Sequence, residues 1–240
     1  MKLSNMDIVY IVRPGDDNEE LRYSLRSVAK NMPHRSIVIA GHTPAWVQNV
    51  YSIEIEQNEP KYVNAENNWR AAMADGNITD QFVVMNDDFY IMKPVLKVNE
   101  LTLHRGSLES VIGYYAKMPG PYISNMRRTR DLLVRLGYDV TELKSYALHI
   151  PMVMDRLKRR ILQHVIDEAG YEPYQVQMRT LYGNFWNVGG VEISDVKTSN
   201  HDTAVADNDT FLSSNDQSFN DGVMGQLIRE KFKNKCKYER

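Results

Sequence analysis

The chain has 240 residues, of which 42% are hydrophobic and 25% are charged, as is typical of a folded protein with a large core. Its formal net charge of −2 excludes a polycation built to coat nucleic acid or an anionic membrane. The one cysteine, Cys236, excludes an internal disulfide framework and a thiolate zinc site. With no signal-peptide pattern and no window approaching the roughly 18 apolar residues of a membrane span, we expect a cytoplasmic protein.

Strands and helices are expected to alternate over the first part of the chain. Residues 7–12 are apolar and β-branched and end before Pro14 and Gly15, as expected for a strand followed by a loop. Asp17 stands three residues before Glu20, a capping-box pattern that predicts the start of a helix. Further strands are expected at 36–40, 51–55 and 81–85, and a further helix at 64–73.

This alternation predicts an α/β fold with a mostly parallel sheet and helices on both faces. In such sheets, ligands bind beyond the carboxyl ends of the strands. The loop 13–17, the loop 42–44 and the turn 86–88 each follow an expected strand. We therefore expect these three segments at one edge of the sheet, around a binding site.

The second half of the chain is less regular. Residues 125–136 and 154–168 have the amphipathic pattern of helices, and a strand containing His149 is expected at 145–153. A last helix is expected near 221–232. We predict a single domain over the whole chain, divided near residue 95, with a helical insertion at about 105–140.

The segment 82–95 reads FVVMNDDFYIMKPV and places Asn86, Asp87 and Asp88 directly after an apolar strand. Adjacent carboxylates there repel one another and lose water, and a divalent cation compensates such a pair. Mg²⁺ and Mn²⁺ prefer oxygen ligands, and Mg²⁺ is commonly held by one or two carboxylates together with substrate phosphates. The turn therefore predicts a metal site at Asp87 and Asp88. The alternative is a solvated turn in which one of the two caps the next element.

Several motifs follow one another in a recognisable order. They are ELRYSLRS at 20–27, Pro44 with Trp46, and NDDF at 86–89. This order resembles the Stealth family, whose members include bacterial capsule sugar-phosphate transferases and the animal N-acetylglucosamine-1-phosphotransferase. Fainter similarities to later regions of that family are His149 with Pro151, Arg179, and Asn215 with Asp216.

The resemblance implies a GT-A-type nucleotide-sugar fold, a divalent Mn²⁺ or Mg²⁺ on the acidic turn, and a polar cluster around the donor phosphates. It implies that residues 1–95 bind the nucleotide sugar and that residues 96–240 form the acceptor and catalytic half. The site residues that we expect fall into two groups. The nucleotide side has Arg13, Asp16, Arg22, Asn86 and Asp87, and the catalytic side has His149, Arg179 and Asp216.

One position departs from the family's pattern. The first region of the family usually reads Trp-Val-Asp-Gly-Ser-Asp-Pro, whereas residues 11–17 read IVRPGDD and place Arg13 at the position of an aspartate. A guanidinium pairs well with phosphate, so we expect Arg13 to contact the nucleotide. The departure favours glycosyl transfer over the family's own sugar-phosphate transfer.

We therefore expect a metal-dependent glycosyltransferase that moves a sugar from a nucleotide-diphosphate sugar to a hydroxyl acceptor on a glycan, a protein or DNA. The first alternative is a Stealth-type sugar-1-phosphate transferase. A metal-dependent nuclease also needs paired carboxylates, although it does not require the βαβ units. A non-catalytic module that binds a nucleotide sugar is the third alternative.

Some of these residues and clusters have plainer explanations. His149 follows an apolar run and also suits a buried core histidine. Asp216 also suits the N-cap of a helix at 219–227. Basic clusters at 127–130, 156–160 and 231–237 are expected to be solvated faces, unless two of them converge near the acidic turn and attract a polyanion such as DNA.

Overall fold

The computed structural model describes residues 2–15, 17–118, 120–198 and 210–240. The chain forms two compact units. The first comprises Met1–Leu101, His149–Met154 and Val196–Arg240, and the second comprises Thr102–Leu148 and Asp155–Asp195. The expectation of a single domain divided near residue 95 stays a prediction.

The first unit contains a central sheet with the strand order β3-β2-β1-β4-β7. β1 pairs in parallel with β2 on one side and with β4 on the other, and β2 pairs in parallel with β3. The predicted α/β fold with a mostly parallel sheet is therefore confirmed. The strands are β1 (Asp7–Val12), β2 (Ile37–Gly41), β3 (Tyr51–Glu54), β4 (Gln81–Asn86) and β7 (Met152–Asp155).

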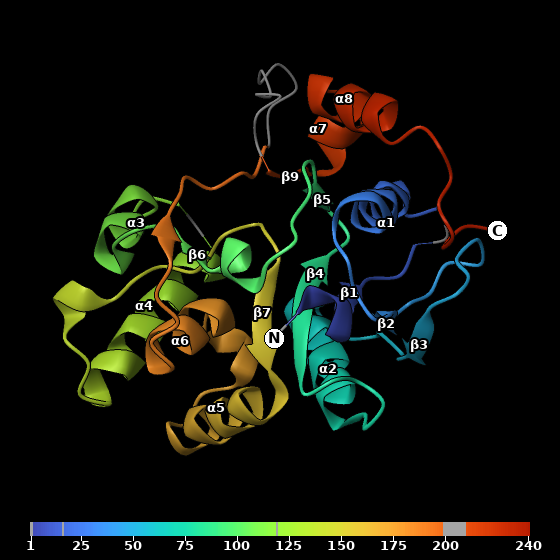
Figure 1. The fold of residues 1–240 in the computed structure, drawn as a ribbon. Coiled ribbons are helices and arrows are strands. Elements are labelled where there is room, and N and C mark those ends of the chain that lie inside the picture. The colour runs from blue at the N-terminus through green and yellow to red at the C-terminus, as the bar shows by residue number, and fades with distance from the viewer. Residues whose placement is uncertain (1, 16, 119, 199–209) are drawn as a thin grey trace. The chain divides into compact units, whose positions relative to one another are not determined.

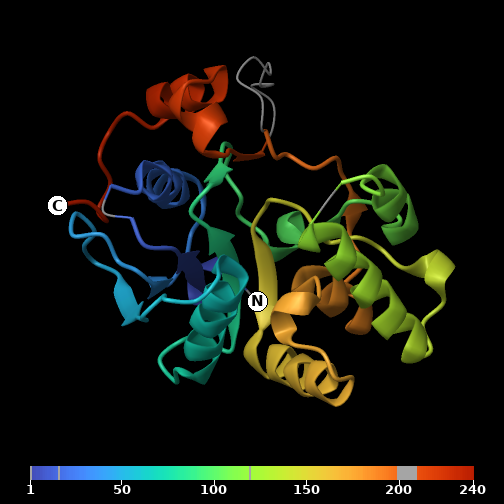
Figure 2. The same cartoon turned by 180° about the vertical axis from the view of Figure 1, so that it is seen from behind.

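Two helices connect these strands. α1 (Glu19–Asn31) leads from β1 to β2, and α2 (Lys61–Ala74) leads from β3 back across the sheet to β4. Because right-handed crossovers in opposite directions place their helices on opposite faces, α1 and α2 lie on either side of the sheet (Figures 1 and 2). The strand order reverses between β1 and β4. Ligands bind in α/β sheets at the carboxyl ends of strands where the order reverses in this way.

The start of α1 differs from the expected capping box. Asn18, not Asp17, is the N-cap, and its side-chain oxygen accepts a hydrogen bond from the Leu21 amide at 3.1 Å. Asn18 has a φ of 27°, and asparagine tolerates positive φ better than most residues. Glu19 and Glu20 occupy the first turn, where the helix dipole favours negative charge.

The remainder of the first unit has a hydrophobic cluster that includes a stacked pair of aromatic rings. β5 (Phe89–Ile91) and β9 (Phe211–Ser213) pair antiparallel, and α7 (Asp216–Asn220) and α8 (Val223–Lys231) follow. Tyr90 stacks on Phe219 with ring centroids 6.1 Å apart. The last predicted helix is thus confirmed as α8, with α7 as a separate short helix before it.

The second unit is mostly helical. The helices predicted at 125–136 and 154–168 are confirmed, although α4 begins earlier, at Pro121, whose fixed φ suits a first helical turn. A parallel pair of short strands, β6 and β8, accompanies them. The elements are α3 (Leu108–Tyr114), α4 (Pro121–Arg135), α5 (Arg156–Glu168), α6 (Met178–Phe185), β6 (Leu103–His104) and β8 (Val191–Glu192).

The strand predicted at 145–153 is mostly wrong, because only its last two residues belong to β7. Ser145 instead exchanges backbone hydrogen bonds with Arg105 and Gly106, at 2.7 and 2.9 Å. Pro151, which has no N–H to donate, precedes the true start of β7.

The helices have one buried face each. In α5, for example, the buried positions Arg159, Leu162 and Ile166 recur at helical spacing, and the other positions of the helix are mostly polar. Within the described part of the chain, no helix combines the length and the apolarity that crossing a bilayer requires.

Candidate functional site

A cavity of about 360 Å³ lies in the first unit, beside the carboxyl end of β1. We call it the carboxylate pocket. It is formed by the loop after β1, the first turn of α1, and α7. Its polar lining includes Arg13, Asn18, Glu20 and Asp216, and Phe219 forms part of its apolar wall.

The acidic turn lies next to this pocket. β4 ends at Asn86, which pairs in register with Ile11 of β1, so Asp87 and Asp88 follow at the same edge. Asn18, in the pocket wall, donates a hydrogen bond to Asp87 Oδ2 at 3.1 Å. Burial and the neighbouring Asp88 raise the pKa of Asp87, and the Asn18 hydrogen bond opposes that rise.

Asp88 is paired with a lysine from a distant part of the chain. Lys197 Nζ lies 2.5 Å from Asp88 Oδ2 and also donates to the backbone oxygen of Ser214. The Ser213 hydroxyl approaches the same carboxylate oxygen at 3.4 Å. The other oxygen, Asp88 Oδ1, is buried and accepts no hydrogen bond from the residues that the structure describes.

These contacts bear on the predicted metal site. Among residues 2–15, 17–118, 120–198 and 210–240, no group of three or more His, Cys, Asp or Glu side chains is arranged to hold a metal ion. A cation on this turn would thus depend on two protein carboxylates and on oxygens of a bound phosphate, a coordination that Mg²⁺ commonly uses. The unpartnered Asp88 Oδ1 fits such a ligand. The assignment of Asp87 and Asp88 as metal ligands stays a prediction.

Glu20 is a residue of the pocket that the sequence did not single out. Its side chain lines the cavity, yet the residue is only 8% exposed, and Oε1 accepts a hydrogen bond from the Ser214 hydroxyl at 2.5 Å. Burial, with added repulsion from Asp88, Asp87 and Asp216, raises the pKa of Glu20 to about 7, and the hydrogen bond from Ser214 opposes that rise. A group with this pKa exchanges protons readily at neutral pH.

A polar stripe on α1 explains where Glu20 lies. Glu20, Ser24, Ser27 and Asn31 recur at spacings of three and four residues, so they share one helical face, and all four are buried. Ser24 Oγ donates to Phe89 O at 2.5 Å, and Asn31 Nδ2 donates to the Ile91 backbone oxygen at 2.6 Å. The Ile91 amide donates to Ser27 Oγ at 3.0 Å. The stripe thereby fixes β5, and with it the acidic turn, against α1. Polar residues at helical spacing beside the apolar stripe of Leu21, Leu25 and Val28 were the signal for this in the sequence.

Arg13 and Asp216 form an ion pair across the pocket. Arg13 Nη2 lies 2.9 Å from Asp216 Oδ1, and the two side chains are 67% and 72% exposed. Asp216 is not the N-cap of α7, because Asn215 takes that position and accepts a hydrogen bond from the Ser218 amide at 2.8 Å. Because the ion pair with Arg13 is exposed, a ligand can replace Arg13 as the partner of Asp216.

Arg22 has a different environment. Its guanidinium lies 4.0 Å from the centre of the Trp46 ring, and Nη1 donates to Glu239 Oε2 at 3.2 Å. Trp46 in turn donates its indole hydrogen to Asp17 O at 2.9 Å. These contacts anchor the loop before α1. The expected contact of Arg22 with a nucleotide stays a prediction.

The other predicted site residues are dispersed. His149 belongs to the first unit, where it is half-buried and packs edge-on against Phe89, directly after the acidic turn, at 6.2 Å between ring centroids. Asn86 is exposed at the end of β4. Arg179 lies in the second unit, on α6, and donates to Leu148 O at 2.8 Å. Asp16 lies outside the residues that the structure describes.

Comparison with known proteins gives little to identify the chain. No family model matches it, and no curated protein matches its sequence. A solved structure with some similarity is that of the glycosyltransferase GlyE from Streptococcus pneumoniae TIGR4, at 10% identity and a TM-score of 0.39. The match covers 95% of this chain and 50% of that one, so the chain spans about half the length of GlyE. A likeness this distant assigns neither a family nor an activity, and membership of the Stealth family stays a prediction.

Proposed function

We propose that the protein is a glycosyltransferase that takes a sugar from a nucleotide-diphosphate sugar and passes it to a hydroxyl acceptor. One observation carries the proposal: Glu20 and Asp216 line a pocket at the carboxyl end of β1, and the acidic turn of Asp87 and Asp88 lies beside it, at the end of β4. The strand order reverses between these two strands, where α/β sheets bind nucleotides.

The donor diphosphate would contact Arg13 and the acidic turn. Arg13 is exposed at the pocket. Among the described side chains, it forms a hydrogen bond only with Asp216, which is exposed as well. A phosphate oxygen can replace that carboxylate, because a guanidinium binds phosphate through the same parallel N–H groups. In this arrangement Arg13 orients the donor with its diphosphate toward the end of β4.

Divalent Mn²⁺ or Mg²⁺ belongs to the proposal as a partner of the diphosphate. When held by Asp87 and Asp88, such a cation would neutralise charge on the departing diphosphate. Lys197 already supplies a positive charge at Asp88 Oδ2. Lys197 thus supplies positive charge at the acidic turn whether or not a metal joins it.

Glu20 is the group proposed to accept the proton of the acceptor. Its pKa of about 7 leaves a substantial fraction ionised at neutral pH, and its position in the pocket wall gives a hydroxyl access to the carboxylate. The acceptor O–H bond breaks as Glu20 takes the proton, and the oxygen forms a bond to the anomeric carbon. The bond between that carbon and the diphosphate oxygen breaks, and the nucleoside diphosphate leaves with the electron pair. Ser214 holds Glu20 in place and Tyr90 supports Ser214, at 2.9 Å between their oxygens.

The test is a screen of UDP-, GDP-, CMP- and ADP-linked sugars for thermal stabilisation in the presence of Mn²⁺. A ligand that binds the folded protein raises its melting temperature. We expect one nucleotide class to stabilise the protein and Asp88→Asn to abolish the effect. Asp167→Asn, an exposed carboxylate on α5, is the matched control and should behave as the parent. Stabilisation of Asp88→Asn equal to that of the parent would show that the turn does not hold the donor.

A second candidate is the transfer of a sugar 1-phosphate. The observation that favours it is the ELRYSLRS stretch, which resembles the Stealth family of sugar-phosphate transferases. Several residues of this stretch form the buried polar stripe of α1 beside the pocket. The released nucleotide separates the two reactions. A nucleoside diphosphate supports glycosyl transfer, and a nucleoside monophosphate supports phosphosugar transfer. Cleavage of DNA with Mg²⁺ and no sugar nucleotide would instead indicate a nuclease.

A further inference from the structure

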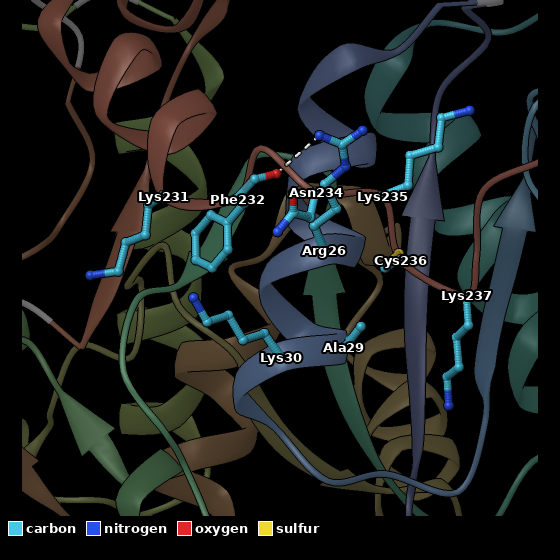
Figure 3. Close-up of a pocket in the computed structure, with 9 residues that line it drawn as sticks. All are labelled: Arg26, Ala29, Lys30, Lys231, Phe232, Asn234, Lys235, Cys236 and Lys237. Atoms are coloured by element: carbon cyan, nitrogen blue, oxygen red, sulfur yellow. Dashed lines mark hydrogen bonds between the residues drawn. The ribbon is translucent and has the colours of Figure 1, made fainter.

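A second pocket, of about 450 Å³, lies at the other end of α1 from Glu20. We call it the basic pocket (Figure 3). The last turns of α1, the end of α8 and the segment after α8 form it. Because a helix rises about 1.5 Å per residue, Lys30 in this pocket lies roughly 15 Å along the axis from Glu20. Its cationic lining consists of Arg26, Lys30, Lys231, Lys235 and Lys237.

The charge of Arg26 is already neutralised within the protein. Its guanidinium forms two hydrogen bonds of 2.7 Å with the buried carboxylate of Glu239. A third bond, drawn in Figure 3, joins Nη1 to the Phe232 backbone oxygen at 3.0 Å. Arg26 therefore forms part of the pocket wall and contributes little net charge to it.

The four lysines differ from Arg26 in this respect. Lys30 and Lys237 point their ammonium groups at the rings of Phe232 and Tyr238, and Lys235 donates to the backbone oxygen of Arg240. None of the four forms an ion pair with an Asp or Glu side chain of the described residues, and none of the described residues that line the pocket is acidic. Four positively charged side chains in the lining of one pocket attract an anion. Lys231, the fourth of these lysines, lies in the last turn of α8.

We propose that the basic pocket binds a small ligand that carries two or more phosphate groups. Ammonium groups bind phosphate as point charges, so several phosphates suit several lysines. The cavity volume of about 450 Å³ is in the range of small-molecule sites, which run from about 300 to 1,000 Å³, and a concave site favours a small ligand over the surface of a nucleic acid. The proposal is independent of the reaction at the carboxylate pocket.

The chain provides its own reporter for this site. Cys236 lines the basic pocket and is the only cysteine of the 240 residues, so reaction of the protein with a disulfide reagent reports on this place alone. Tripolyphosphate is the probe. A ligand that covers the thiol slows its modification by the factor 1 + [L]/Kd, about tenfold when its concentration is tenfold above Kd. We expect this protection at constant ionic strength, with a chloride salt as the reference.

A pair of variants tests which lysines are responsible. Lys30→Gln combined with Lys231→Gln should abolish the protection, whereas Lys2→Gln combined with Lys97→Gln, which removes the same charge from exposed sites outside the pocket, should retain it. Lys30 and Lys231 also lie in the last turns of their helices, where a cation stabilises the helix. A lower melting temperature of the double variant would therefore not by itself support ligand binding at the pocket. The readout is therefore thiol protection of the folded protein, with circular dichroism to establish that both double variants are folded.

Three results would overturn the proposal. The first is unchanged thiol reactivity at millimolar tripolyphosphate, and the second is equal protection by chloride at matched ionic strength. The third is protection by duplex DNA without protection by tripolyphosphate, which would assign the patch to nucleic acid. Should the Lys30 and Lys231 double variant fail to fold, Lys235→Gln combined with Lys237→Gln, which removes charges outside any helix, replaces it with the same expected loss.

Discussion

Lys197 Nζ lies 2.5 Å from Asp88 Oδ2, so the acidic turn is paired with an ammonium group from 109 residues further along the chain. The two side chains are only 25% and 17% exposed, which leaves little water to compensate either charge alone. An ammonium and a divalent cation compete for the same carboxylate. If the turn holds a metal as we propose, this lysine would limit how strongly the metal binds.

Replacing Lys197 by methionine is expected to strengthen Mn²⁺ binding in the absence of nucleotide. Removing the competing charge leaves Asp88 with both oxygens for a cation, and we expect a gain of about tenfold, or roughly 1.4 kcal/mol. Isothermal titration with Mn²⁺ measures it. Lys97→Met, at an exposed site away from the turn, should leave the affinity unchanged. Equal affinity of parent and Lys197→Met would mean that Asp88 is not a metal ligand.

Glu20→Gln is expected to change the pH dependence of stability. The folded pKa of Glu20, about 7, lies above its ordinary value of 4.5, so the protonated form is the one that suits the fold. The contribution of Glu20 to stability is thus fully present below pH 4.5 and is lost as the pH rises through 7. The parent should lose about 1 to 3 kcal/mol relative to Glu20→Gln between pH 5 and pH 8.

Denaturant unfolding of the two proteins at pH 5 and pH 8 measures this difference. Glu54→Gln, on the exposed surface of β3, should show no such dependence. A parallel response of the parent and Glu20→Gln at both pH values would contradict the raised pKa of Glu20.

Glu239→Gln is expected to destabilise the first unit strongly. Glu239 is fully buried as a side chain, and its loss leaves the Arg26 guanidinium buried without its carboxylate, which typically costs about 3 to 5 kcal/mol. Burial alone would raise the pKa of Glu239, but the hydrogen bonds and charge of Arg26 lower it to about 2. The stability that the ion pair provides is therefore present above pH 4.5 and is lost as the pH falls toward 2.

Chemical unfolding across this pH range checks the ion pair. The difference between the parent and Glu239→Gln should shrink steadily from pH 5 downward. A difference that does not depend on pH would show that lost packing, not the charge of Glu239, causes the destabilisation.

Gly225→Ala is expected to displace α7, which forms part of the wall of the carboxylate pocket, although Gly225 itself does not line that pocket. A Cβ at Gly225 would lie 1.6 Å from the Phe219 backbone oxygen, so α8 would have to move away from α7. Overpacking of this kind costs about 1 to 3 kcal/mol. α7 carries Asp216 and Phe219 of the carboxylate pocket, so donor binding should weaken as well.

The control is Gly113→Ala on α3, where nothing lies within 4 Å of the added carbon. In a helix this change is expected to be neutral or to stabilise by up to about 1 kcal/mol. Thermal unfolding and nucleotide-sugar binding measure both variants. Unimpaired stability of Gly225→Ala would show that the two helices can separate at no cost.

The local pattern of the sequence was enough to predict most of the sheet and the acidic turn. The strands near residues 7–12, 36–40 and 81–85 are short apolar runs ended by turn residues, and their alternation with helices implied parallel pairing. The turn of Asp87 and Asp88 follows directly, because the end of a strand places the next residues at the edge of the sheet. The failure at 145–153 has a cause that no local pattern reveals, namely backbone pairing of Ser145 with a segment about 40 residues earlier in the chain.

The partners of the polar side chains were decided only by the tertiary structure. Glu20 meets Ser214 across 194 residues, and Arg26 meets Glu239 across 213. Such pairs depend on which segments the folded chain brings together, whereas hydrophobic periodicity records only whether a residue faces the core. The sequence by itself therefore placed the acidic turn and the loop after β1 at the ends of β4 and β1, where the candidate site lies. The fold determined its chemistry, because the pKa of a carboxylate depends on the burial and the charges that packing assembles around it.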